Sequence, residues 1–328
     1  MSFRRRRPNQ GLISLVLIAL LFALGAGQNA SSASLQEKKA ADQRHGEQDE
    51  PLKLHSDLVV VSVTVTDKNG QYAHGLAAKD FTIVEDDKAQ TVDSFSAEEA
   101  PFAAAILVDM SGSMEYKFGM VRTAAASFVD QIRDSDQVAV YGFNNKVRQF
   151  QDFTNSHDIT DYIWDAKAED TTRLYDCMND AITALAKREE KRRAILLISD
   201  GCDTSSQKAS FGGVMKAALA AGITVYTVDL TEDNLLASSG SEAMELRRGR
   251  NEMKEFSNQS GGLYVHSPQG DKLQEAFTNI VDELRNQYTL TYYPTNQKRD
   301  GRWRKLSIGA ARPGLSVRTR RGYFAPKA

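Results

Sequence analysis

Hydroxyl and carboxylate side chains gather directly after an apolar segment in the stretch FAAAILVDMSGSM, residues 102–114. Asp109, Ser111 and Ser113 place three oxygen donors within five residues, with no His or Cys among them. Such a set can cap the helix that follows, or it can supply part of the shell of a hard cation. The two alternatives differ in whether polar side chains from other loops converge on the same place.

Two further loops carry oxygen donors at corresponding positions. Asp200 directly follows the apolar run AILLIS, and Thr172 stands just before the helix that precedes this run. In open α/β sheets, sites form outside the carboxyl ends of the strands. Together the loops offer two carboxylates and three hydroxyls, which suits Mg²⁺. Because hydroxyls do not cancel the charge of the ion, it keeps an affinity for an external anionic oxygen.

An alternation of apolar strands and amphipathic helices predicts the elements that position these loops. Strand patterns occupy 102–108, 137–143, 194–199 and 223–228, and helical spacing starts at 118, 174 and 211. A polar insert follows the fourth strand, and the segments LYVH and KLQEAFTNIVDELRNQ complete the pattern. This alternation predicts a doubly wound α/β domain over 101–286, a mostly parallel sheet with helices on both faces.

Both flanks of this domain have β patterns. Residues 57–100 contain the alternating LVVVSVTVTDKNGQ, with an Asn-Gly turn signal, and FTIVEDDKAQTVDSFS, and residues 287–328 contain further alternating apolar residues. Neither flank has enough strands to be stable alone. Since the chain ends of a domain often lie close together, we expect the two flanks to pair into one smaller, all-β, sandwich-like domain.

The N-terminus has the layout of an export signal. Residues 4–7 are arginines, 12–24 are apolar almost throughout, and small residues follow. The apolar run is short for a membrane span, which needs about 20 residues. We therefore predict a cleaved signal peptide over 1–27 and a flexible linker over 28–56. The protein would then be secreted or periplasmic, with an uncleaved inner-membrane anchor as the alternative and membrane contact only in that case.

The composition argues against a nucleic-acid partner, and the sequence does not decide whether the two cysteines form a disulfide. The 41 basic and 43 acidic residues give a net charge of -2, without the basic footprint of a nucleic-acid-binding protein. Cys177 and Cys202, the only cysteines, lie a few residues beyond Thr172 and Asp200. Export favours a disulfide between them, which would brace the site, but two separate buried thiols are an equal alternative because bridging requires close Cα atoms.

The motif DMSGS, residues 109–113, resembles the D-x-S-x-S signature of von Willebrand factor type A domains, and TTRLYD and LLISDGCDT resemble the loops that complete the metal-ion-dependent adhesion site of that family. The flanks resemble those of a bacterial subgroup of secreted proteins with this domain, and the likeness covers residues 57–326. The resemblance implies Mg²⁺, with Mn²⁺ or Ca²⁺ as alternatives, held by Asp109, Ser111, Ser113, Thr172 and Asp200. Thr171 is a substitute for Thr172, which is favoured because it lies nearer the start of the helix.

Enzymatic alternatives lack the residues they need. A haloacid-dehalogenase-type phosphatase requires a second Asp where this chain has Ser111, and neither a G-x-S-x-G elbow nor a phosphate-binding G-x-x-x-x-G-K-[ST] motif occurs. We therefore expect a non-enzymatic adhesion or assembly module of the cell envelope that binds a protein presenting Asp or Glu. The alternative is a structural envelope protein with a vestigial metal site.

Overall fold

The computed structural model describes residues 58–97, 100–157, 171–237, 239–266, 268 and 270–327. The predicted signal peptide and linker lie outside these residues. Of the helices that are described, none combines the length and the apolar character needed to cross a membrane.

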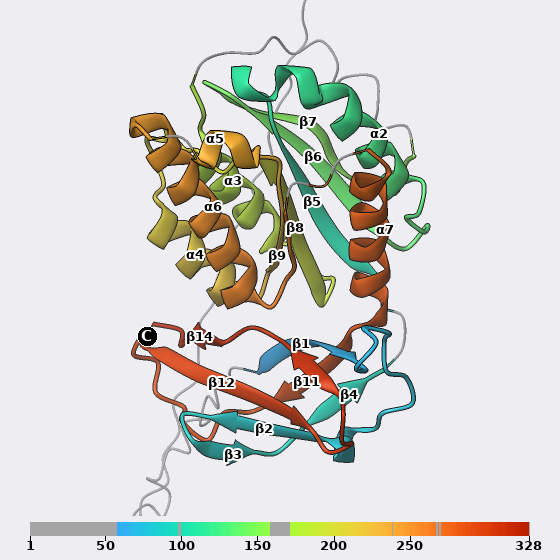
Figure 1. Ribbon diagram of the computed structural model, residues 1–328. Coiled ribbons are helices and arrows are strands. Elements are labelled where there is room, and N and C mark those ends of the chain that lie inside the picture. Colours follow the sequence, from blue (N-terminus) through green and yellow to red (C-terminus); the bar gives the residue numbers. More distant parts are fainter. Residues whose placement is uncertain are drawn as a thin grey trace, which may run out of the picture. The chain divides into compact units, whose positions relative to one another are not determined.

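A six-stranded sheet in the order β10-β9-β8-β5-β6-β7 forms the centre of the larger domain (Figure 1). Neighbouring strands are parallel except for β7, which pairs antiparallel with β6 at one edge. Every residue of β5 is buried, because helices cover both faces of the sheet. The strands are β5 (Phe102–Asp109), β6 (Gln137–Phe143), β7 (Val147–Thr154), β8 (Arg192–Ser199), β9 (Thr224–Asp229) and β10 (Tyr264–His266).

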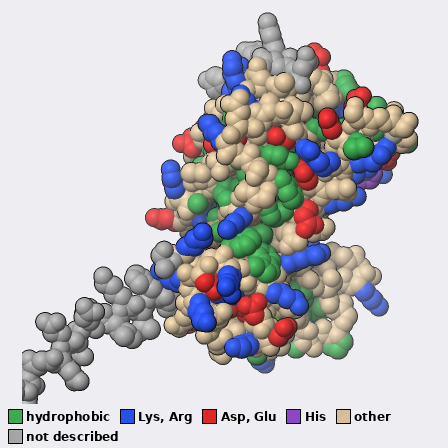
Figure 2. Space-filling model, turned by 90° about the vertical axis from the view of Figure 1, so that its left-hand side faces the viewer, with side chains coloured by type: hydrophobic (Ala, Val, Ile, Leu, Met, Phe, Trp, Pro, Cys, Tyr) green, Lys and Arg blue, Asp and Glu red, His purple; other side chains and the backbone are tan. Residues whose placement is uncertain are grey.

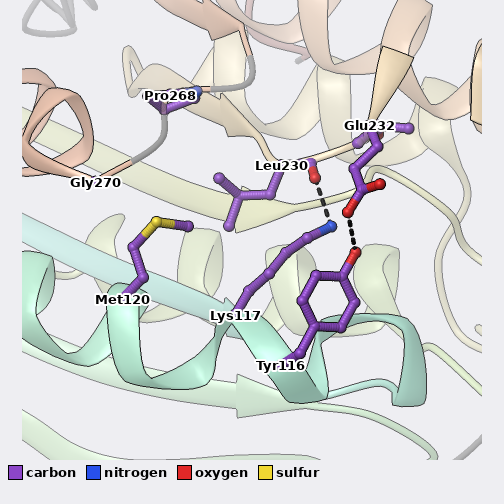
Figure 3. Close-up of a pocket in the computed structure, with 8 residues that line it drawn as sticks. Tyr116, Lys117, Met120, Leu230, Glu232, Pro268 and Gly270 are labelled. Atoms are coloured by element: carbon purple, nitrogen blue, oxygen red, sulfur yellow. Dashed lines mark hydrogen bonds between the residues drawn. The ribbon is translucent and has the colours of Figure 1, made fainter. Parts of the chain in front are cut away.

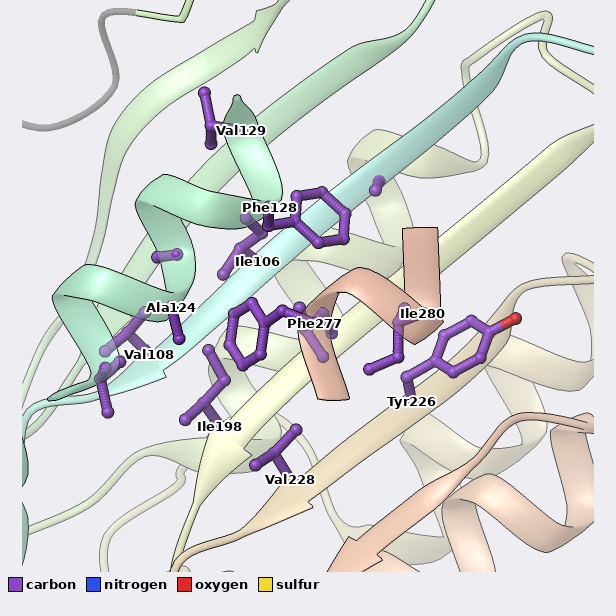
Figure 4. Close-up of a cluster of buried hydrophobic side chains, with 14 of the residues drawn as sticks. Ile106, Val108, Ala124, Phe128, Val129, Ile198, Tyr226, Val228, Phe277 and Ile280 are labelled. Atoms are coloured by element: carbon purple, nitrogen blue, oxygen red, sulfur yellow. The ribbon is translucent and has the colours of Figure 1, made fainter. Parts of the chain in front are cut away.

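Two helical layers enclose this sheet. Alternate residues of β5 face opposite layers: Ile106 packs with α2 and α7, and Leu107 packs with α3, α4 and α6. Figure 4 shows Phe128 and Phe277, whose ring centroids are 6.3 Å apart, beside Ile106. The predicted fold class is confirmed. The helices are η1 (Ala78–Asp80), η2 (Gly112–Lys117), α2 (Phe118–Val129), α3 (Leu174–Leu185), α4 (Phe211–Ala220), α5 (Asp233–Ala237), α6 (Ser241–Ser260) and α7 (Asp271–Asn286).

The segment expected to be a polar insert is mostly helical. It contains α5 and the 20-residue α6. One face of α6 is buried through Leu246, Gly249, Met253 and Phe256. The charged residues of the helix are exposed or half-buried, and Arg250 among them turns inward to bond the buried Asp229 at 2.7 Å. A narrow apolar face within a strongly charged sequence explains why the helix is hard to recognise from composition.

The remaining strands form a β-sandwich from both flanks of the chain. One sheet has the order β13-β1-β11-β4 and the other β14-β12-β2-β3, so each combines strands that precede and follow the α/β domain. They share a core that includes Val61, Val63 and Leu290. The strands are β1 (Val59–Thr66), β2 (Phe81–Glu85), β3 (Lys88–Gln90), β4 (Ser94–Ser96), β11 (Tyr288–Tyr292), β12 (Trp303–Ala310), β13 (Ser316–Arg318) and β14 (Gly322–Phe324).

Two buried arginines hold the α/β domain to the sandwich and to the segments that lead into it. Arg192, at the start of β8, is fully buried and donates to the carbonyl oxygens of Ala100 at 3.4 Å and Arg285 at 2.9 Å. Arg320 bridges the domains by donating to the carbonyl oxygens of Leu219 and Val60. The carboxyl ends of the parallel strands therefore point away from the sandwich (Figure 1). On the face shown in Figure 2, basic and acidic side chains are interspersed.

Candidate metal centre

Asp109 ends the central strand β5 and is fully buried. Its Oδ1 accepts a hydrogen bond from the backbone N–H of Ser111 at 2.9 Å. Its Oδ2 accepts one from the hydroxyl of Ser199, at the end of the adjacent strand β8, at 2.5 Å. The parallel pairing of β5 and β8 brings these two strand ends together. The carboxylate is thus fixed in orientation before any ligand arrives.

The two serine hydroxyls connect this strand end to the second carboxylate. The Oγ atoms of Ser111 and Ser113 are 3.0 Å apart, and Ser113 donates to Oδ2 of Asp200 at 2.6 Å. Ser111 is the N-cap residue of η2, but its side chain makes no capping hydrogen bond. The helix-cap alternative therefore does not account for these hydroxyls, which contact each other and a carboxylate from another loop.

The loop that carries Asp200 is held by close backbone contacts. Gly201 has a φ of +85°, which favours glycine, and its N–H donates to the hydroxyl of Ser199 at 2.8 Å. Gly249 of α6 lies so near that a Cβ atom there would be 2.5 Å from the carbonyl oxygen of Gly201. The hydroxyl of Thr231 donates to the carbonyl oxygen of Asp200 at 3.1 Å. The helix and the loop after β9 together position this carboxylate.

Thr172 lies on a third loop, against the loop that begins with Asp200. Its N–H donates to the hydroxyl of Thr204 at 2.8 Å, and its carbonyl oxygen accepts from the N–H groups of Thr204 and Ser205 at 3.0 and 2.9 Å. Thr172 is buried, whereas Thr171 is exposed. Thr172 stays the predicted ligand on this loop.

Burial and a neighbouring charge raise the cost of ionising Asp109. Burial raises the pKa of Asp109 to about 7, the charge of Asp200 adds to this, and hydrogen bonds from Ser199 and Ser111 oppose it. Over the part of the chain that the structure describes, no three His, Cys, Asp or Glu side chains gather as a metal site. The centre contains two carboxylates, so its capacity for a cation depends on hydroxyl oxygens, in a donor set that fits Mg²⁺.

Both cysteines are free thiols in the structure, which corresponds to the alternative without a bridge. Cys177 is fully buried in α3, and Cys202 is partly buried. Burial raises the pKa of both thiols, so neither has the thiolate character that a nucleophile needs.

Three residues near the centre have roles that sequence reasoning missed. Asp176, in the first turn of α3, accepts hydrogen bonds from the N–H groups of residues 207, 208 and 209 at 3.1, 2.8 and 3.0 Å. Asp203 accepts from the N–H of Tyr175 at 3.2 Å. Ser199 orients Asp109, and the only signal for this was its place at a strand end directly before Asp200.

Comparison with known proteins identifies the larger domain. The family model of the von Willebrand factor type A domain matches residues 105–279, more than half of the 328 residues. No curated protein matches the chain.

Similar solved structures have low sequence identity. BatB from Bacteroides thetaiotaomicron is 18% identical, with a TM-score of 0.44 over 56% of this chain and 98% of that chain. A von Willebrand factor type A protein from Catenulispora acidiphila is 12% identical, with a TM-score of 0.47 over 80% and 72%. Proximal thread matrix protein 1 from the mussel byssus, whose structure has a zinc-occupied MIDAS motif, is 16% identical, with a TM-score of 0.47 over 61% and 49%. The family assignment therefore rests on the match between the family model and residues 105–279.

Proposed function

Because the chain belongs to the von Willebrand factor type A domain family, we propose that it is a protein-binding module that works through a divalent cation. Mg²⁺ is held by Asp109, Ser111, Ser113, Thr172 and Asp200, either directly or, for the carboxylates, through water. An Asp or Glu side chain of a partner completes the shell. The main support is the hydrogen-bonded chain from Ser111 through Ser113 to Asp200, beside the buried Asp109.

The donor set explains why the occupant from outside should be acidic. Mg²⁺ commonly takes six oxygen ligands and binds carboxylates in preference to neutral groups. Three of the five candidate side chains are neutral hydroxyls, so an added carboxylate meets less charge repulsion than it would in an all-acid site.

We place the module in the cell envelope, secreted or periplasmic, because of the export signal in the sequence. The candidate centre lies at the carboxyl ends of β5 and β8, and the sandwich lies toward their amino ends, where Arg320 joins it to α4. The binding surface is thus at the end of the domain away from the sandwich. A structural envelope protein with a vestigial metal site remains the competing function.

A pull-down distinguishes the two functions. The exported protein is immobilised and exposed to envelope extract with Mg²⁺ or with a chelator, beside a Ser111→Ala, Asp200→Ala double variant. We expect a partner that is captured only by the unmodified protein in Mg²⁺. Thr183→Ala is the matched control, since its hydroxyl is exposed and bonds within α3 to the carbonyl oxygen of Asn179. Equal capture in chelator and by the double variant would support the structural alternative.

A further inference from the structure

A pocket of about 320 Å³ opens beside the candidate metal centre (Figure 3). Three segments line it: the end of η2 with the first turn of α2, the loop after β9, and the residues that precede α7. The lining side chains used below are Tyr116, Lys117, Met120, Leu230, Thr231 and Pro268, with Glu232 at the rim.

The pocket and the metal centre share a wall. Thr231 lines the pocket, and its hydroxyl donates to the carbonyl oxygen of Asp200 at 3.1 Å. Tyr116 follows Ser113 by three residues on η2. The charge of Asp200 is among the causes that raise the pKa of Tyr116 to about 12, after its hydrogen bond to Glu232. A ligand bound at the centre would therefore have its neighbouring residues over this pocket.

The polar groups of the pocket are engaged with one another, which leaves carbon surface for a ligand. Lys117 is 8% exposed, and its Nζ donates to the carbonyl oxygen of Leu230 at 2.6 Å and lies 4.8 Å from the ring centroid of Tyr116. The hydroxyl of Tyr116 donates to Glu232 at 2.6 Å. Figure 3 shows both bonds, with Met120 and Pro268 on the other side of the pocket. Methionine, leucine, proline and the tyrosine ring then form an apolar interior.

Exposed apolar side chains also occur on the segments that follow the central strands. The described residues include six large apolar side chains that are exposed. Three of them follow the carboxyl ends of β5 and β9: Tyr116 at 67%, Leu235 at 40% and Met244 at 68%. The partner segment that fits this surface therefore carries apolar as well as acidic residues.

We propose that the pocket receives a large apolar side chain, of the leucine, methionine or phenylalanine class, from the same partner segment whose Asp or Glu completes the metal shell. The inference rests on the proposed function, and it adds a sequence preference to it: an acid with a large apolar residue within two positions. The metal ion binds the acidic side chain, and the pocket binds the large apolar residue near it.

An array of synthetic peptides tests the preference. Each peptide has one fixed Asp, and the two positions on either side of it are varied one at a time through Ala, Ser, Leu, Met, Phe and Lys. The full-length exported protein is applied in Mg²⁺ and in chelator. We expect Mg²⁺-dependent binding that is about tenfold stronger for Leu, Met or Phe than for Ala beside the Asp, the ratio expected for burying one such side chain.

A variant whose pocket is filled by a larger side chain tests the preference in a second way. Met120→Trp occupies the pocket from α2, and Thr183→Trp adds the same side chain at an exposed site on α3 as the control. We expect Met120→Trp to abolish the preference and to keep Mg²⁺-dependent binding of the Asp-Ala peptides. Mg²⁺-dependent binding with no neighbour preference, or a preference that survives Met120→Trp, would overturn the pocket inference alone. Binding of acidic peptides that ignores chelator would overturn the proposed function and the inference with it.

Discussion

At the scale of single residues, the centre is defined by two buried carboxylates and the hydroxyls between them. The sequence motif identified Asp109, Ser111, Ser113 and Asp200, and the structure brings these four into one hydrogen-bonded chain. Ser199 could not be assigned from sequence, because a serine at a strand end is common and its partner lies 90 residues away. The role of Asp176 was missed for a similar reason, since its three partners lie on a distant loop.

The raised pKa of Asp109 predicts a stability that depends on pH. The pKa in the folded protein is about 7, above the ordinary 3.8, so the folded state holds the proton more tightly than the unfolded state does. The resulting destabilisation is absent below about pH 4 and complete above about pH 7. Asp109→Asn removes this charge. In chelator, its Tm should equal that of the unmodified protein near pH 4 and exceed it by a few degrees above about pH 7.

Comparing the unmodified protein with Asp109→Asn also distinguishes the effect of the buried charge on stability from the effect of metal binding. With excess Mg²⁺ the unmodified protein should gain Tm, and Asp109→Asn should not. Thermal scans at several pH values, with chelator and with Mg²⁺, measure both effects. A Tm difference that is constant with pH in chelator would show that the cost of burying this charge has been misassigned.

The hydroxyl ligands predict a loss of cation affinity without a loss of fold. Ser111→Ala and Thr172→Ala should each weaken Mg²⁺ binding by about 10- to 100-fold, the usual range for changes in the surroundings of a metal. Calorimetric titration measures the affinity, and circular dichroism checks the fold. Thr183→Ala should leave the titration unchanged. An unaltered titration for Ser111→Ala would remove it from the ligand set.

At the scale of elements, strongly periodic segments were predictable and weakly apolar ones were not. The alternation of strand and helix predicted the parallel sheet, because a strand covered on both faces must be apolar throughout. α6 was taken as part of a polar insert, since Leu246, Met253 and Phe256 are sparse among charged residues. Its position depends on tertiary contacts, above all the approach of Gly249 to Gly201, which no local pattern reveals.

The contact between Gly249 and Gly201 predicts that Gly249→Ala destabilises the protein, whereas helix propensity alone predicts that it stabilises it. Replacing Gly by Ala inside a helix normally stabilises it by about 0.5–1 kcal/mol. At Gly249 the new Cβ would lie 2.5 Å from a carbonyl oxygen, so α6 or the Asp200 loop must move. We expect Gly249→Ala to destabilise by about 1–3 kcal/mol and to weaken Mg²⁺ binding.

Gly212→Ala in α4 is the control, because nothing lies within 4 Å of the new Cβ. Urea unfolding of both variants, with and without Mg²⁺, gives the two free energies of unfolding. Equal or greater stability for Gly249→Ala would mean that the helix can withdraw from the loop at no cost.

At the scale of the whole molecule, the sandwich depends on both flanks of the chain. β1 lies between β13 and β11, and β2 lies between β3 and β12, so neither sheet can be completed by one flank. A chain that ends at residue 287 should leave residues 58–97 without their partners. We expect rapid amide hydrogen exchange and protease cleavage in that segment, measured by mass spectrometry. Persistent protection there would show that the N-terminal strands fold independently.

The register of β1 also has a mechanical consequence. Val59 pairs with Tyr292 and Val63 with Tyr288 in an antiparallel ladder, and β11 follows α7 at Tyr288. A force pulling residue 58 away from the α/β domain would therefore act on opposite ends of the paired strands. In this shear geometry the hydrogen bonds between the strands resist together and cannot open one after another as in a zipper. A bound partner pulling on the far end of the domain would strain the sandwich along its most resistant direction.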